Sequence, residues 1–472
     1  MFTLLSNIAE SGLSSWLLVL DNWADRTIKG SILGRLVRKP DRDVACDRDV
    51  SCNVSTILLF LSITILFSSL SLPQFANDRF GIGIIVLICF FIFVINSIVN
   101  KFSFEFNFID FLLLLLICVS LVSTFSSYFL KESLMGLFKC FVFLIWYFVA
   151  KFTLQNSSNK VFTNLWIIVT ITATITALIG IYQYVIGVEP LATWEDPNAE
   201  TTYTRVYSTL GNPNLLAGYL IPILPIAIVL QFKNKLGWLF KIFSSAVILI
   251  CLIFTGSRGA YLGLIVGFIF SVFVLLNYLI NKVKEKNKTV LFFGLFFCFI
   301  VVIVGISFLF PVVFERISTI FTLREHSSNS YRVNVWLACL QMLRDNWLIG
   351  IGPGNNTFRL AYGLYMISGF DALAAYNIFL EFAIEFGVFG CILFVLIVLI
   401  SFLKLHYLFW MKGNIYALGI FISLISLLTH GMFDTVFFRP QVFILFWFLL
   451  SSVDKIDKMG KIDKIESEAK KN

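Results

Sequence analysis

Charged residues are scarce in this sequence. Only 14% of its 472 residues are Asp, Glu, Lys or Arg, and 58% are hydrophobic, whereas a soluble domain has about a quarter charged and about half apolar residues. The excess apolar residues fall in blocks of about 17 to 25, the length that crosses the core of a bilayer. This composition excludes an ordinary soluble domain and predicts a polytopic membrane protein in contact with the lipid bilayer.

Residues that could bind a metal or a nucleotide are also few. The chain has only three histidines, His326, His406 and His430. Its nine cysteines show neither a disulfide framework nor metal-ligand spacing. The glycine-rich run 350–356 resembles a phosphate loop, but no Gly-Lys-Ser/Thr follows it. We therefore expect no metal, no nucleotide and no other cofactor.

Lysine marks one side of the predicted membrane. The net charge of +8 does not indicate a nucleic-acid partner, because the lysines lie in short loops and tails, where they act as topology signals. If the loops with Lys101, Lys151, Lys160, Lys404 and Lys412 are cytoplasmic, both termini are cytoplasmic too, and the number of spans must be even. Twelve spans satisfy this condition. They are expected at 54–72, 80–99, 108–125, 133–152, 162–186, 214–231, 238–255, 259–280, 289–310, 377–403, 414–433 and 440–453.

The expected fold is an all-α transmembrane helical bundle in three parts. Residues 1–53 form a cytoplasmic segment that is amphipathic and then basic, 54–453 form the transmembrane domain, and 454–472 form a Lys-rich cytoplasmic tail. The domain contains one long extracytoplasmic loop, 311–376. Apolar residues recur at helical spacing over about 330–348, which predicts an amphipathic helix lying on the membrane.

Arginine, rather than lysine, predominates in the outer loops. Its planar guanidinium matches a phosphate or a carboxylate with two parallel hydrogen bonds, so we expect an anionic ligand on this face. The alternative is that the arginines pair with acidic side chains or with lipid headgroups. These arginines are Arg205, Arg258, Arg316, Arg324, Arg332, Arg344, Arg359 and Arg439.

Two short turns each carry one of these arginines. In the first, Arg205 precedes Gly-Asn-Pro-Asn, where Asn212 is expected to be extended because proline follows it. Asn214 is expected to cap the next helix. In the second, the run Thr-Gly-Ser-Arg-Gly places Arg258 at the outer membrane edge, either as a phosphate clamp or as a snorkelling side chain.

A polar stripe enters the membrane after the long loop. Asn377, Glu381 and Glu385 are spaced four residues apart, so they share one face of a helix. Ionisable groups within a span are costly and usually face a site or a partner. His430 and Asp434 lie four apart near another outer helix end, but they have too few possible companions for a metal site.

Taken together, these stretches resemble the O-antigen ligase and polymerase superfamily of bacterial membrane proteins. The resemblance covers about residues 165–450 and rests on the GNPNLLAGYL turn, the TGSRG turn, the RxNxW…GxGPGN loop and the YNIFLEFAIEFGVFG helix. The form RIST…REHSSNSYRVNVW is most similar to the cyanobacterial branch labelled as inorganic carbon (bicarbonate) transporters.

The resemblance implies a function on the periplasmic face of the bacterial inner (plasma) membrane. It implies transfer of a glycan from a polyprenyl diphosphate carrier to an acceptor, without metal or nucleotide. Arg205 and Arg258 would grip the diphosphate, with Arg332 as a further group, and Asn212 and Asn214 would shape the pocket.

One position departs from the family pattern. The ligases carry a histidine just before the Asn-Ile-Tyr/Phe-Leu run, as the base for the acceptor hydroxyl, and this chain has Tyr376 there. A tyrosine with an ordinary pKa of about 10 is a poor base at neutral pH. Either Glu381 takes that role, or this branch no longer transfers glycans, so whether the chain is an enzyme stays open.

Three hypotheses therefore follow from the sequence. The first is a metal-independent membrane glycosyltransferase, with Tyr376 or Glu381 addressing the acceptor. The second is a transporter, or an accessory to one, that accepts bicarbonate or another small anion at the same arginines. Against it stands the lack of an inverted repeat or a pair of broken helices. The third is a structural membrane protein without a site.

Overall fold

The described part of the chain is helical throughout. The computed structural model describes residues 13–30, 54–72, 81–188, 205–233, 238–282, 328–367 and 369–469, with the single residues 294 and 297. Within these ranges every regular element is a helix and no strand occurs. The all-α class predicted from the apolar blocks is therefore confirmed for the described residues.

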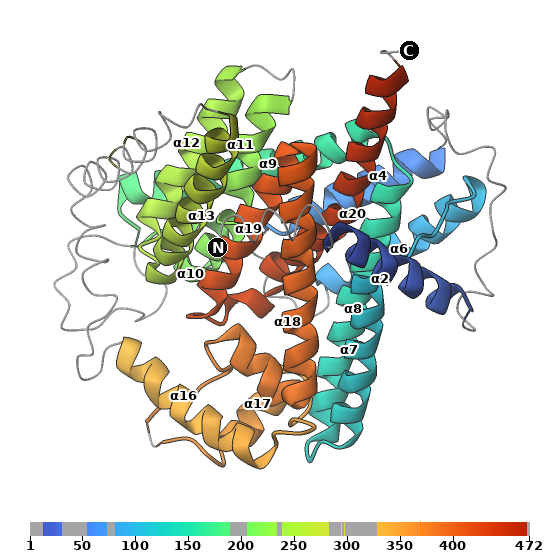
Figure 1. Cartoon of the computed structure of the whole chain (residues 1–472). Coiled ribbons are helices and arrows are strands. Elements are labelled where there is room, and N and C mark those ends of the chain that lie inside the picture. Colours follow the sequence, from blue (N-terminus) through green and yellow to red (C-terminus); the bar gives the residue numbers. More distant parts are fainter. Residues whose placement is uncertain are drawn as a thin grey trace.

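Figure 1 shows how the helices are arranged. In chain order they are α2 (Leu13–Gly30), α4 (Val54–Ser69), α6 (Gly81–Val99), α7 (Phe108–Phe125), α8 (Leu130–Gln155), α9 (Asn159–Ile186), η2 (Ser208–Leu210), α10 (Pro213–Leu220), α11 (Ile223–Lys233), α12 (Trp238–Phe254), α13 (Arg258–Lys282), α16 (Ser328–Asp345), α17 (Asn355–Tyr362), α18 (Ile378–Lys412), α19 (Ile415–Gly431), η4 (Val436–Phe438) and α20 (Pro440–Ala469).

Much of this set has the character of membrane spans. By length and composition, six helical segments among the described residues can cross a membrane, and four shorter helices are also strongly apolar. The protein is thus a multi-pass membrane protein. Every predicted span from 54 to 280 and from 377 to 453 coincides with helix, whereas the predicted span 289–310 lies outside the described residues. The total of twelve spans stays a prediction.

Aromatic side chains join the long helices. Helix α8 packs along α20, α7 along α18, and α13 along α19. Between α8 and α20, the indole of Trp146 donates to the carbonyl of Ile444 at 3.0 Å and meets the ring of Phe67 edge-on at 5.8 Å. Such edge-to-face pairs add about 0.5–1.5 kcal/mol to the burial of the rings. The abundant phenylalanine of this chain therefore serves helix packing as well as contact with lipid.

The long predicted loop contains two helices. They lie beside the ends of α7, α8 and α18 (Figure 1). Helix α16 covers most of the segment 330–348 for which the sequence predicts an amphipathic helix; that it lies on the membrane stays a prediction. Helix α17 was not predicted from the sequence. Its first residues belong to the glycine-rich run 350–356, and it packs on α16 and on α8. Residues 311–327, with Arg316 and Arg324, lie outside the described residues.

A break in α18 fastens this region to the bundle. Gly387 has φ +70° and ψ −174°, which interrupts the helix near its start. The freed backbone pairs with the preceding loop: the N–H of Val388 donates to the carbonyl of Trp347 at 2.8 Å, and the N–H of Ile351 donates to that of Ile384 at 2.9 Å. The loop at 347–354 is therefore held by α18 through backbone hydrogen bonds.

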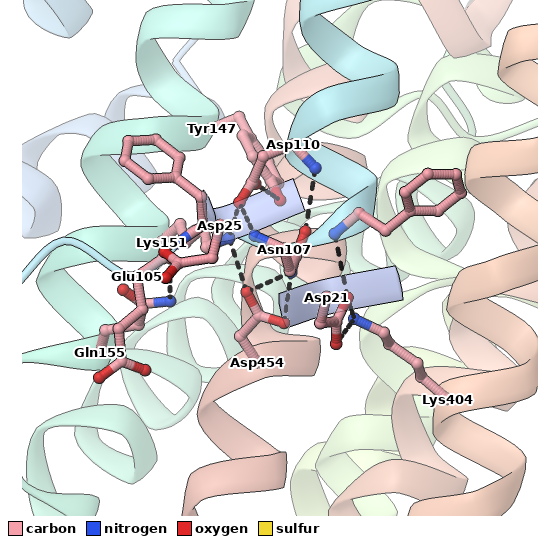
Figure 2. Close-up of polar contacts among 12 residues, drawn as sticks. Asp21, Asp25, Glu105, Asn107, Asp110, Tyr147, Lys151, Gln155, Lys404 and Asp454 are labelled. Atoms are coloured by element: carbon pink, nitrogen blue, oxygen red, sulfur yellow. Dashed lines mark hydrogen bonds and ion pairs between the residues drawn. The ribbon is translucent and has the colours of Figure 1, made fainter. Parts of the chain in front are cut away.

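A buried charge network lies among α7, α8 and α20 (Figure 2). The ammonium of Lys151 lies against the carboxylate of Asp110, and both side chains are fully buried. It also pairs with Asp454 at 2.8 Å. The phenol of Tyr147 donates to Asp110 at 2.8 Å, and the amide of Asn107 donates to Asp454 at 2.6 Å. The sequence places Lys151 in an inner loop, which is wrong: these partners allow a lysine to be buried inside α8.

The N-terminal helix α2 docks beside this network. The carboxylate of Asp21 binds Lys404 at 2.8 Å and accepts from the N–H of Phe108 at 3.0 Å, at the start of α7. The carboxylate of Asp25 accepts from the N–H of Phe106 at 3.2 Å. On the opposite side, Trp16 is 67% exposed. A helix thus occurs in the predicted segment 1–53, and the face that binds the bundle combines Asp21 and Asp25 with the buried Leu17, Ala24 and Ile28.

Candidate functional site

The carboxylate of Asp434 is the centre of a polar cluster at the end of α19. One of its oxygens accepts from the side-chain amide of Asn214 at 2.7 Å and lies 3.6 Å from the guanidinium of Arg332. The other accepts from the N–H of Val436 at 3.2 Å, which closes the turn into η4. Asp434 is buried. Its turn therefore brings α10 and α16 together around one negative charge.

Asn214 extends the cluster to Arg205. The guanidinium of Arg205 donates to the side-chain oxygen of Asn214 at 2.6 Å and to the carbonyl of Thr255 at 2.8 Å. Gly256, at φ +59°, lies against the same arginine, so that a Cβ there would come within 3.4 Å of its stem. The turn after α12 thus forms one wall for the arginine side chain.

The segment that carries Arg205 is fastened at its own backbone. The N–H of Val206 donates to the carbonyl of Phe254 at 3.2 Å. The side-chain oxygen of Gln183, on α9, accepts from the N–H of Ser208 at 2.6 Å. These hydrogen bonds fix the backbone next to Arg205 and therefore the direction in which its side chain points.

The turn before α10 corrects one prediction. Asn212, not Asn214, is the N-cap of the helix: it is extended, at φ −149°, and its side chain accepts from the N–H groups of Asn214 and Leu215 at 2.8 and 3.1 Å. Pro213 occupies the first helical position, where its missing N–H costs nothing. Asn214 consequently lies inside the helix, and its side chain bridges Arg205 and Asp434.

Tyr376 lies beside Arg332. The guanidinium carbon of Arg332 is 5.9 Å from the centroid of the Tyr376 ring, and Tyr331 meets that ring edge-on at 5.7 Å. Tyr376 has φ +52°, a left-handed conformation that is uncommon for any residue other than glycine. Burial raises the pKa of Tyr376 above its ordinary value. The phenol therefore stays protonated at neutral pH and cannot act there as a base.

The polar stripe of α18 binds backbone. Asn377 caps α18, with its side chain accepting from the N–H of Phe379 at 3.0 Å. The buried carboxylate of Glu381 accepts from the N–H of Ala375, and that of Glu385 accepts from the N–H of Gly354 at 2.7 Å. The structure thus gives all three side chains a part in folding the loop onto α18. The roles in a reaction or in ligand binding that the sequence predicts for them stay predictions.

Arg258 is the first residue of α13, and a single residue separates it from Gly256, which lies against Arg205. Between them lies Ser257, whose hydroxyl is 3.4 Å from Nε2 of the fully buried His430.

The sequence analysis considered His430 and Asp434 only as metal ligands. Their spacing of four residues at a predicted outer helix end was the only feature of the sequence that pointed to a site there. The partners of Asp434 are far away in the sequence.

The cluster contains two guanidinium groups and one carboxylate. Arg205 is linked to Asp434 through Asn214, and the guanidinium of Arg332 lies 3.6 Å from Asp434. Guanidinium groups bind phosphate and carboxylate with charge-assisted hydrogen bonds. Across the described ranges, no group of three or more His, Cys, Asp or Glu side chains could hold a metal ion. Anion binding at this cluster therefore stays a prediction.

Comparison with known proteins gives one match. Residues 243–395 match the family model of the O-antigen ligase. The matched stretch includes Arg258, Arg332 and Tyr376, and excludes Arg205, Asn214 and Asp434. A comparison with curated proteins gave no match. Over this segment, which supplies Arg332 to the cluster, the chain is similar to the O-antigen ligase family.

Proposed function

We propose that the Asp434 cluster binds the diphosphate of a polyprenyl-linked glycan and serves its transfer to an acceptor. The observation that carries this proposal is the continuous chain of contacts from Arg205 through Asn214 and Asp434 to Arg332. It joins residues from three segments, two of which carry a guanidinium group. The match of residues 243–395 to the O-antigen ligase family supports the same reading.

The chemistry would depend on charge and position. In the transfer, the acceptor oxygen bonds to the anomeric carbon of the sugar as the bond from that carbon to the diphosphate breaks, and the acceptor proton passes to a base, the role predicted for Glu381. Negative charge grows on the leaving diphosphate, and guanidinium groups already in place stabilise it. Arg258 would add a second donor on the side of Arg205. Asp434 would not touch the anion; it would hold Asn214 and Arg332 in the directions that the anion requires.

The proposed setting is the periplasmic face of a bacterial inner membrane, with both chain termini in the cytoplasm. Two features support it. Asn156, Lys404 and Lys455, from predicted inner loops and the tail, contact residues of the same predicted side. The cluster draws its residues from predicted outer segments only.

Binding of a polyprenyl diphosphate to the purified protein tests the proposal. We expect Arg258→Ala and Arg205→Ala each to weaken binding at least about tenfold, because each loses a charge-assisted hydrogen bond worth about 1.5–3 kcal/mol. The matched control is Arg359→Ala. Arg359 is on the same predicted face but 61% exposed, and it lies 4.0 Å from Asp371. Equal affinity in the three variants and the wild type would reject the proposed role.

A second function is favoured by Tyr376. Because its phenol stays protonated, the described cluster offers an anion site without a base at the position where the ligases have one. A site of this kind could accept bicarbonate or another small anion, in a transporter or in an accessory to one, as the cyanobacterial resemblance implies. Uptake of labelled bicarbonate into proteoliposomes decides: flux no greater than in empty vesicles excludes transport by the chain alone.

A further inference from the structure

His430 is a buried polar side chain packed between two helices other than its own. It lies on α19 and is fully buried. A Cβ added to Gly218 of α10 would come within 3.3 Å of its ring, and one added to Gly259 of α13 within 2.9 Å. The two glycines therefore provide the space that the imidazole occupies.

These contacts join two segments that supply the Asp434 cluster to the start of α13. Helix α10 supplies Asn214, α19 leads to Asp434, and α13 begins with Arg258. The only side-chain hydrogen bond found for the ring among the described residues is that of Nε2 with the hydroxyl of Ser257, at 3.4 Å. Ser257 is itself buried and lies next to Arg258. The imidazole thus links the turn before Arg258 to α19, the helix that precedes Asp434.

The second ring nitrogen faces a different environment. Within the described part of the chain, Nδ1 of His430 is buried and has no hydrogen-bond partner. The charged groups that act on the ring are Asp434 and Arg332. A buried polar atom normally has a partner, because leaving it without one costs about 1–3 kcal/mol. This cost, in a side chain that also contacts two other helices, points to a role for His430 beyond filling space.

We propose that His430 is a positioning residue for the anion site, which holds the Arg258 turn in register with Asp434 through Ser257. This rests on the proposed function for the identity of the ligand, but not for the contact itself. Imidazole suits the task because a neutral ring offers one donor and one acceptor and is small enough to lie between two glycines. An apolar side chain would fill the space without fixing the turn.

The first test is a double-mutant cycle on affinity. With inorganic pyrophosphate as the probe, His430→Leu and Ser257→Ala should each weaken binding about fivefold, which corresponds to the loss of one hydrogen bond of about 1 kcal/mol. The double variant should bind no more weakly than either single one, because both remove the same contact. His430→Gln, which keeps a donor and an acceptor, should recover part of the loss. Losses that multiply in the double variant, or an unchanged affinity, would overturn the proposal.

A second cycle distinguishes positioning from general damage to the fold. In an Arg258→Ala background, His430→Leu should cause little further loss of pyrophosphate affinity, since the arginine that it positions is absent. In an Arg359→Ala background the loss should be undiminished. A histidine that only supports the fold would weaken binding equally in both backgrounds. If His430→Leu does not fold, Ser257→Ala carries the same comparison.

A measurement that needs no ligand separates this proposal from the proposed function. Hydrogen exchange of the backbone amides at 255–258 should be about fivefold faster in His430→Leu than in the wild type, as one stabilising hydrogen bond of about 1 kcal/mol is lost. Hydrogen exchange in α7, which is distant in sequence from residues 255–258, should not change. If the wild type binds no diphosphate, the proposed function fails, and the exchange rates still decide whether His430 holds the turn. Unchanged exchange at 255–258 would refute that.

Discussion

Replacing Lys151 by methionine is expected to destabilise the folded protein by about 3–5 kcal/mol. The ammonium of Lys151 lies between the carboxylates of Asp110 and Asp454, and Lys151 and Asp110 are fully buried. Methionine has a similar length but leaves two neighbouring carboxylates without a cation. A buried charge that loses its partner keeps its desolvation cost and gains nothing in return. The thermal midpoint of the detergent-solubilised protein and the folded yield measure the effect.

Lys404→Met is the matched control. Lys404 also pairs with an aspartate, Asp21, at 2.8 Å, but the carboxylate is 33% exposed. Water can solvate it after the lysine is removed, so the cost should be about 1 kcal/mol or less. Adding Asp110→Asn and Asp454→Asn to Lys151→Met should recover much of the lost stability, because the uncompensated charges are then removed. Equal midpoints for the two lysine variants would show that Lys151 is not held as the structure indicates.

The network also shows where sequence reasoning about the fold stops. Helix α7 was predicted at 108–125 and begins and ends there. An uninterrupted apolar run defines its length, and Asn107 and Asp110 form a capping box at its start. Lys151 was misplaced because a lysine between two apolar runs looks the same whether water or buried carboxylates surround it. One of those carboxylates, Asp454, is about 300 residues away in the sequence.

The candidate site shows the same limit. Arg205, Asn214 and Arg332 were predicted from their residue types and outer positions, and the structure joins them. Asp434, which holds them together, was not chosen, because its partners come from α10 and α16 and no local spacing reveals them. Glu385 raised the opposite difficulty. Its partner is a backbone N–H, that of Gly354, and a pattern of side chains does not show which backbone groups will need an acceptor.

Gly387→Ala is expected to cost about 4 kcal/mol of stability. Gly387 has φ +70° with ψ −174°, a conformation that is essentially restricted to glycine. A Cβ there would lie 2.2 Å from the carbonyl oxygen of Leu348 and 2.9 Å from the nitrogen of Ile349. Both are backbone atoms, so no side-chain rotation relieves the clash. The loop at 347–354 would have to move away from α18.

Substitutions at two other glycines distinguish backbone strain from the backbone clash as the cause of the stability loss in Gly387→Ala. Gly413 has φ +63°, but a Cβ there would meet nothing within 4 Å, so Gly413→Ala should show the backbone strain alone, about 1–2 kcal/mol. Gly83 lies inside α6 with open space around it, and Gly83→Ala should stabilise the helix by about 0.5–1 kcal/mol. Thermal midpoints that follow this order would assign most of the Gly387 effect to the backbone clash. A Gly387→Ala protein as stable as Gly413→Ala would contradict the close approach of the loop.

Gly387→Ala should also weaken ligand binding at the Asp434 cluster. The hydrogen bonds from Val388 to Trp347 and from Ile351 to Ile384 hold the loop against the start of α18. Tyr376, two residues before that helix, lies beside Arg332. If the junction opens, the support for Arg332 on this side is lost, so diphosphate affinity should fall in Gly387→Ala and remain at the wild-type value in Gly413→Ala. Faster hydrogen exchange at Ile351 and Val388 should accompany the lower affinity. An opened junction with unchanged affinity would mean that Arg332 is held by Asp434 alone.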